Sequence, residues 1–144
     1  MASKDYEKIA LDYAGAVVDG EIVACKYVIQ ACQRQLDDLD REGFDYHFNP
    51  PMEDGNGKDY KPGSRVCAFI EKLQHIKGKW ARTPIRLEPP QIFWLMCIFG
   101  WVDAKGLRRF KTAYLEVPRK NAKSTLLSGV ALYMLCADQE GGPE

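Results

Sequence analysis

The sequence has no excess of charge of either sign. Its 144 residues contain 20 lysine and arginine residues and 20 aspartate and glutamate residues, so the formal net charge is zero. A dedicated nucleic-acid or anionic-membrane binder needs a positive excess, so any such binding here has to be local. No apolar run approaches the roughly 18 residues of a membrane span, and residues 1–6 show no secretory pattern. We therefore expect a protein without a membrane segment that stays inside the cell.

Metal-ligating residues are also scarce. The five cysteines are an odd number without a Cys-x-x-Cys pair, which argues against a disulfide framework and against a zinc site. The two histidines, His47 and His75, have no partner at metal-ligand spacing, so we interpret both as loop side chains. What the chain does have is apolar material, 46% of its residues, which is enough for the core of one domain.

The first part of the chain has a helical pattern. Ser3 is a candidate cap for a helix through Val18, and residues 19–20 offer a break before a second helix that runs to about Arg41. The second helix carries an apolar stripe at alternating spacings of three and four, made of Ile22, Cys25, Ile29, Cys32, Leu36 and Leu39. Such a stripe predicts packing against the body of the protein, and a docking helix for another subunit is the alternative.

Residues 43–63 are rich in proline and glycine and predict a long loop, the best internal boundary of the chain. We therefore expect a helical amino-terminal extension with its loop at 1–63 and a second unit at 64–144. A third helix is predicted from Ser64 to Gly78. A basic segment surrounds Trp80, and it is either a solvated surface or a phosphate-contacting patch. Its members are Lys72, Lys77, Lys79, Arg82 and Arg86.

Two strongly apolar segments follow. Residues 91–99, opened by two prolines, predict a helix with almost no polar face, which has to be buried. Gln91 is the polar exception at the mouth of this helix. Residues 110–117 are rich in aromatic and branched side chains and predict a strand, and a second short strand is possible at 84–87.

Directly after the predicted strand, residues 118–125 read PRKNAKST and lead into a helical pattern. Strand, short loop, Lys-Ser and helix is the context in which a phosphate-binding loop works, because loop amides and the positive end of the helix meet the phosphates. The motif departs from the usual phosphate-binding pattern, because Val117 and Ala122 occupy the two positions where that pattern has glycine. Alanine at the second position predicts backbone strain or a narrowed pocket. A basic loop that caps a helix through Asn121 or Ser124 is the alternative.

Four stretches in this order resemble the amino-terminal part of tailed-phage terminase large subunits, the ATP-driven motors that package viral DNA. They are LEPPQ at 87–91, IFGW at 98–101, GLRRFKTAY at 106–114 and VPRKNAKST at 117–125. The resemblance covers about residues 69–144. It implies an α/β fold, in which a helical amino-terminal extension precedes the first strand, P-loop and helix of a P-loop ATPase core.

The resemblance also implies roles for the matching residues. Lys123 and Ser124 match the Walker A lysine and hydroxyl, with Ser124 on Mg²⁺. Arg119 matches an arginine that contacts the terminal phosphate, and Gln91 matches a glutamine that reads adenine. The implied catalytic residues are Arg119 and Lys123. The implied ATP-binding set is Gln91, Pro118, Arg119, Lys120, Asn121, Ala122, Lys123, Ser124 and Thr125.

In the family, double-stranded viral DNA, the portal and a small terminase subunit are the partners, and the motor acts as a ring in the host cytoplasm, transiently on the procapsid. The family places the Walker B acid, the catalytic carboxylate and a nuclease domain after this loop. Glu144 follows the loop closely, so we expect these residues to be the front part of a larger motor or a prophage remnant, inactive by itself. A helical interaction module that binds packaging proteins or DNA is the alternative.

Overall fold

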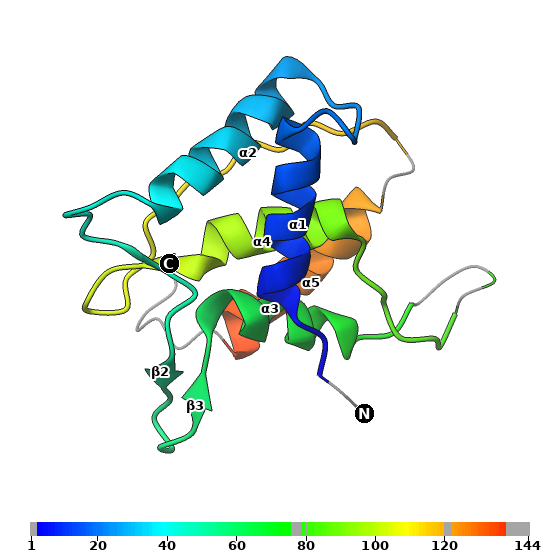
Figure 1. Ribbon diagram of the computed structural model, residues 1–144. Helices are drawn as coiled ribbons and strands as arrows, with labels where there is room; N and C mark the ends of the chain where they lie inside the picture. The colour runs from blue at the N-terminus through cyan, green and yellow to red at the C-terminus, as the bar shows by residue number, and fades with distance from the viewer. Residues whose placement is uncertain (1–2, 76–78, 80, 120–121, 138–144) are drawn as a thin grey trace.

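The structure is a computed structural model that describes residues 3–75, 79, 81–119 and 122–137. The described residues form five helices and four strands of two residues each (Figure 1). The helices are α1 (Tyr6–Val18), α2 (Lys26–Leu39), α3 (Pro62–Glu71), α4 (Pro89–Gly100) and α5 (Lys123–Cys136). The strands are β1 (His47–Phe48), β2 (Met52–Glu53), β3 (Asp59–Tyr60) and β4 (Trp101–Val102), and β1 pairs with β4 and β2 with β3, both antiparallel. This mixture of helices and small sheets is consistent with the predicted α/β class.

Helix α4 lies at the centre, with α1 and α3 packed against it (Figure 1). Its first turn contains Pro89 and Pro90, whose missing N–H groups would be unpaired there in any case. Glu88 caps the helix, and the Gln91 Oε1 accepts the Glu88 N–H at 2.9 Å. Its buried side chains are Ile92, Phe93, Leu95, Met96, Cys97 and Phe99. The prediction of a buried helix with Gln91 at its mouth is confirmed.

The predicted starts of the first two helices were wrong. Helix α1 begins at Tyr6 because the Asp5 carboxylate, rather than Ser3, accepts the Lys8 N–H at 3.0 Å. Helix α2 begins at Lys26, several residues after the break at residues 19–20. The apolar stripe has both buried and exposed members, and Cys32 is buried. Its exposed members are Cys25 together with Ile22, Ile29 and Leu39, the last three each 37–40% accessible.

Helix α3 was also misplaced, because its cap comes from a distant residue. The helix begins at Pro62 and ends at Glu71, so Ser64 lies inside it, and Gly78 lies outside the described residues. The Asn49 Oδ1 accepts the N–H groups of Gly63 at 3.0 Å and of Ser64 at 3.3 Å. The Asn49 Nδ2 donates to the Glu7 Oε2 at 2.9 Å, which ties α1 to the same point. Asn49 is 3% accessible, so this cross-link is inside the protein.

We expect Asn49→Asp to lower the free energy of unfolding by about 2 kcal/mol, because it removes a buried donor and places a second carboxylate beside Glu7. Urea denaturation measures this. Asn56→Asp, the same change in the exposed β2–β3 turn, is the matched control and should stay within about 0.5 kcal/mol of the wild type. Equal stability of the two variants would contradict the role given to Asn49.

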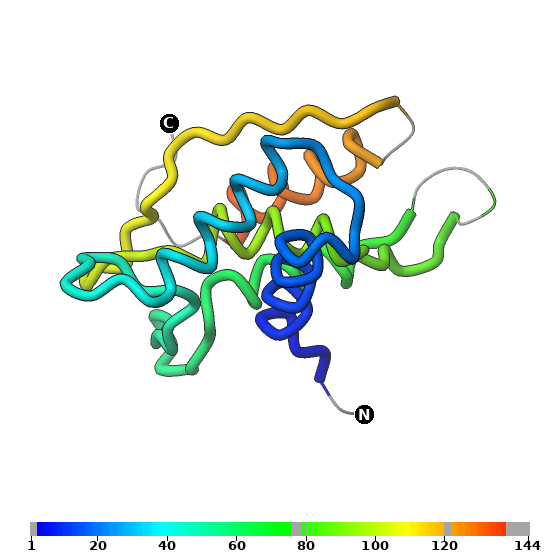
Figure 2. Tube along the Cα trace, turned by 45° about the horizontal axis from the view of Figure 1, so that its top comes forward, coloured from blue at the N-terminus to red at the C-terminus, as the bar shows by residue number. Residues whose placement is uncertain are grey.

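The strand predicted at 110–117 is not formed. The segment is extended and passes along the outside of α2 (Figure 2), but it has no ladder with any part of the chain that the structure describes. A strand needs a hydrogen-bonding neighbour, which the segment's own composition cannot supply. At 84–87 a single bridge joins Pro84 to Gln74, while Ile85 and Leu87 are buried.

The start of the extended segment is held by two arginines. The Arg109 Nη1 donates to the Asp38 Oδ2 of α2 at 2.7 Å, and both side chains are more than 80% buried. The guanidinium carbons of Arg109 and Arg34 lie 4.7 and 5.1 Å from the centre of the Phe110 ring. Cation–π contacts of this kind fix the ring over α2. The segment that follows is therefore anchored at its first residue.

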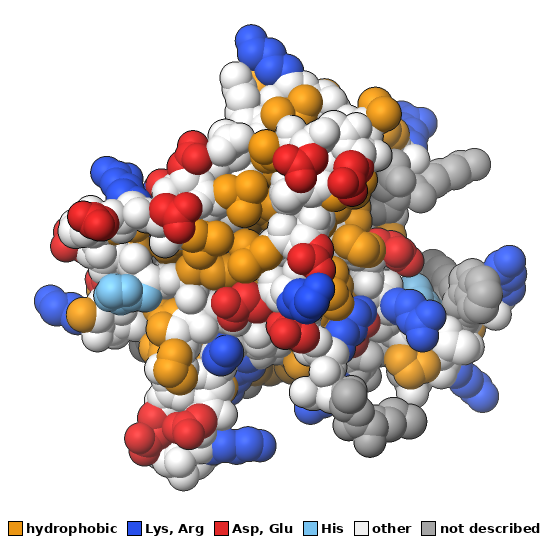
Figure 3. All heavy atoms as spheres, in the orientation of Figure 1, with side chains coloured by type: hydrophobic (Ala, Val, Ile, Leu, Met, Phe, Trp, Pro, Cys, Tyr) orange, Lys and Arg blue, Asp and Glu red, His pale blue; other side chains and the backbone are white. Residues whose placement is uncertain are grey.

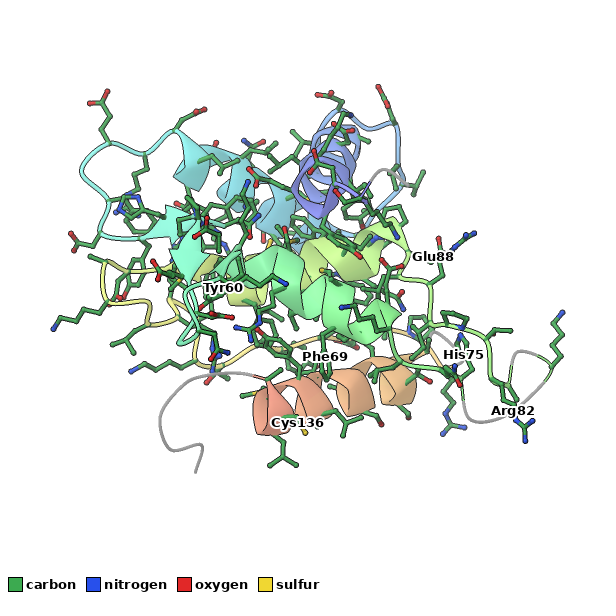
Figure 4. The ribbon with its side chains drawn as sticks, turned by 90° about the horizontal axis from the view of Figure 1, so that it is seen from below. Tyr60, Phe69, His75, Arg82, Glu88 and Cys136 are labelled. Atoms are coloured by element: carbon green, nitrogen blue, oxygen red, sulfur yellow. The ribbon has the colours of Figure 1, made fainter. Side chains whose placement is uncertain are left out.

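Helix α5 packs with one side and leaves the other in solvent. Phe69 of α3 lies over α5 (Figure 4), where its ring centre is 5.4 Å from that of Tyr133 in an edge-on arrangement. Gly129 lets the Ile70 side chain approach closely. Apolar residues on its other side are exposed, namely Leu127, Leu132 and Leu135. Among the described residues, no helix is long and apolar enough to cross a bilayer.

Candidate functional site

The loop that joins the extended segment to α5 is closed by Lys123. Its Nζ donates to the Val117 carbonyl oxygen at 2.8 Å, so the first and last residues of the 117–123 loop meet. Lys123 is thus directed across the loop rather than into bulk solvent. Lys120 and Asn121, both predicted site residues, lie outside the described residues.

Ala122 has a left-handed backbone conformation, with φ +56° and ψ +24°. This is the conformation that glycine adopts at the end of a phosphate-binding loop, and it costs about 1–2 kcal/mol for a residue with a Cβ. Ala122 is also the N-cap of α5 and makes no side-chain cap hydrogen bond. The first N–H groups of a helix have no partner within it and carry partial positive charge. The start of α5 therefore suits an anion.

Gln91 faces this loop across a cavity of about 620 Å³. The walls come from the start of α4 and from both ends of the loop: Glu88, Pro90, Gln91, Trp94, Val117, Pro118 and Ala122. A volume of this size falls within the range of small-molecule sites in proteins. The structure thus brings Gln91 together with Pro118 and Ala122, which follow it in the sequence by 27 positions or more.

Ser124 and Thr125 lie on a different cavity, also of about 620 Å³. Its other polar wall residues are Gln74, His75 and Ser128, and its apolar ones are Leu73, Ile85, Gly129 and Leu132. The predicted site residues are therefore distributed over two cavities on either side of the start of α5. Sequence reasoning missed Gln74 and Ser128, for which no motif exists, and treated His75 as an ordinary loop residue.

The basic residues predicted near the site are in solvent. Arg119 is exposed in the loop, as are Lys72, Arg82 and Arg86 in the earlier basic segment. Lys77 and Trp80 lie outside the described residues. Within those that are described, no group of three or more His, Cys, Asp or Glu side chains could hold a metal ion.

We expect Ala122→Gly to raise the free energy of unfolding by about 0.5–1 kcal/mol, because relief of the left-handed strain exceeds the entropy that glycine loses on folding. Ala131→Gly is the matched control, at an exposed position inside α5. It should lower stability by about 1 kcal/mol. Chemical denaturation of both variants gives the sign of each change in the free energy of unfolding. Destabilisation by Ala122→Gly would contradict backbone strain at Ala122.

Comparison with protein families gives one match in this region. Residues 89–143 match the family model described as the terminase large subunit, ATPase domain. The matched part includes α4, the extended segment, the 117–123 loop and α5. No curated protein and no solved structure matches the chain.

Proposed function

We propose, from the match of residues 89–143 to the family model of terminase large subunit ATPase domains, that the 117–123 loop and α5 bind ATP with Mg²⁺. The observation that carries this proposal is the geometry of the loop. A left-handed Ala122, the start of α5, which no described side chain caps, and the Lys123 ammonium lie around one short turn. These are the features by which backbone amides and a lysine hold phosphates.

The adenine belongs in the cavity beside Gln91. The Gln91 Oε1 is engaged with the Glu88 N–H, whereas the Gln91 Nε2 has no hydrogen-bond partner among the described residues. That amide can donate to a ring nitrogen of the base. The apolar walls supplied by Pro90, Trp94 and Pro118 suit the faces of a flat ring.

The phosphates belong at the start of α5. Lys123 would exchange the Val117 carbonyl for phosphate oxygens, a charge-assisted and therefore stronger partner. The Ser124 hydroxyl, which has no partner among the described residues, would hold Mg²⁺. Arg119 is exposed in the loop and would contact the terminal phosphate. Lys120, Asn121 and Thr125 complete the proposed binding set.

We assign to this part of the protein the binding step of a packaging ATPase. Hydrolysis also needs an acidic residue for Mg²⁺ and a carboxylate that activates water. We propose that these act with the present loop in a complete motor. Such a motor moves double-stranded viral DNA in the host cytoplasm, as a ring on the portal together with a small terminase subunit.

The test is thermal unfolding with and without ATP and Mg²⁺. A ligand that binds the folded state stabilises it by about 2.7 kcal/mol at 100 times its Kd, so we expect the Tm to rise by several degrees. Lys123→Ala should abolish this rise, because the phosphates lose their charged partner. Lys105→Ala, at an exposed turn, is the matched control and should keep it. Absence of a rise in the wild type would refute nucleotide binding and favour a helical interaction module.

A further inference from the structure

The cavity that contains Ser124 combines mostly apolar walls with five hydrogen-bonding side chains. Three hydroxyls of α5 line it, from Ser124, Thr125 and Ser128, and Gln74 and His75 face them. Within the described part of the chain, none of these five side chains has a hydrogen-bond partner. Free donors and acceptors that share one cavity of about 620 Å³ are suited to a polar ligand.

The backbone holds His75 firmly in this position. Its N–H donates to the Thr83 carbonyl at 2.9 Å, and its carbonyl accepts the Arg82 N–H at 2.8 Å. On the preceding side, the Leu73 carbonyl accepts the Ile85 N–H at 2.8 Å. Figure 4 shows His75 beside the end of α5 that begins at Lys123. A side chain on such a fixed backbone loses little entropy when it binds a ligand.

The two cavities are on either side of the start of α5. The position of Ser124 indicates which cavity would hold the base of a nucleotide and which would hold its phosphates. The base side is at Gln91, Pro118 and Ala122. Ser124, whose hydroxyl is proposed for Mg²⁺, lines the other cavity together with His75. If the Ser124 hydroxyl holds Mg²⁺, the terminal phosphate would lie near the Ser124 cavity.

We propose that His75, assisted by Gln74, contacts the terminal phosphate or the Mg²⁺-bound water at the Ser124 cavity, and so makes the site select a nucleoside triphosphate over a diphosphate. This inference rests on the proposed ATP binding. An imidazole N–H and an amide N–H both donate to phosphate oxygens. The same stretch of chain, from His75 to Gln91, then supplies a contact at each end of the nucleotide.

The experiment is isothermal titration of the whole chain with ATP and with ADP, each with Mg²⁺. We expect His75→Ala to weaken ATP binding by about tenfold, the size expected for a lost hydrogen bond to a charged group. ADP binding should stay within about twofold, since ADP lacks the phosphate involved. Gln74→Ala should act in the same direction, and His75→Gln, which keeps an N–H donor, should restore part of the loss.

His47→Ala is the matched control. It removes the other histidine, which is exposed in β1, and histidine side chains appear in Figure 3 as two separate pale-blue patches. Circular dichroism of each variant verifies folding. Equal weakening of ATP and ADP by His75→Ala, or no weakening, would overturn the role of His75. If the wild type binds ATP and Lys123→Ala abolishes it, the proposed function survives that result. A wild type that binds neither nucleotide would overturn both proposals.

Discussion

The architecture depends on the burial of α4. Apart from Gln91 at its mouth this helix presents almost no polar side chain, so water has to be excluded from nearly every side of it. Helices α1 and α3 do so by packing along it, and Asn49 ties their amino-terminal ends together. The polar end of α4, with Glu88 and Gln91, then necessarily lies at the surface. The cavity lined by Gln91, Pro118 and Ala122 is formed at this end because the rest of the helix is covered.

Burial also determines the chemistry of three thiols. Desolvation raises the pKa of Cys67 and of Cys97 to about 12 and that of Cys32 to about 11. These thiols stay protonated and act as small apolar groups in the core. Cys25 and Cys136 are exposed. All five cysteines are free, and three of them are buried.

Sequence patterns predicted those parts of the fold that depend on residues close together in the chain. The boundaries of α4 follow from two prolines and a continuous apolar run, and the end of α1 follows from Asp19 and Gly20. The pattern was misleading where the deciding group is distant. Asn49 caps α3 from 13 residues before its start, and residues 110–117 have strand composition without a neighbouring strand.

The candidate site shows the same division. The octet at 118–125 identified the loop. The backbone strain predicted for alanine in this loop corresponds to the positive φ of Ala122. The resemblance connected Gln91 to this loop, and the two share a cavity. No pattern indicated that Ser124 would face His75, because that depends on how residues 73–85 return to α4. Contacts between separate segments are set by packing, which a single sequence does not display.

The anchored segment at 110–117 has a mechanical consequence. At one end the Phe110 ring makes cation–π contacts with Arg34 and Arg109. At the other end the Val117 carbonyl accepts a hydrogen bond from Lys123. An extended chain is already near its maximum length per residue, so it acts as an inextensible tether between these two points. The segment therefore limits how far the start of α5 can move away from α2. Its fixed points are Asp38, bound through Arg109, and Lys123, bound through Val117.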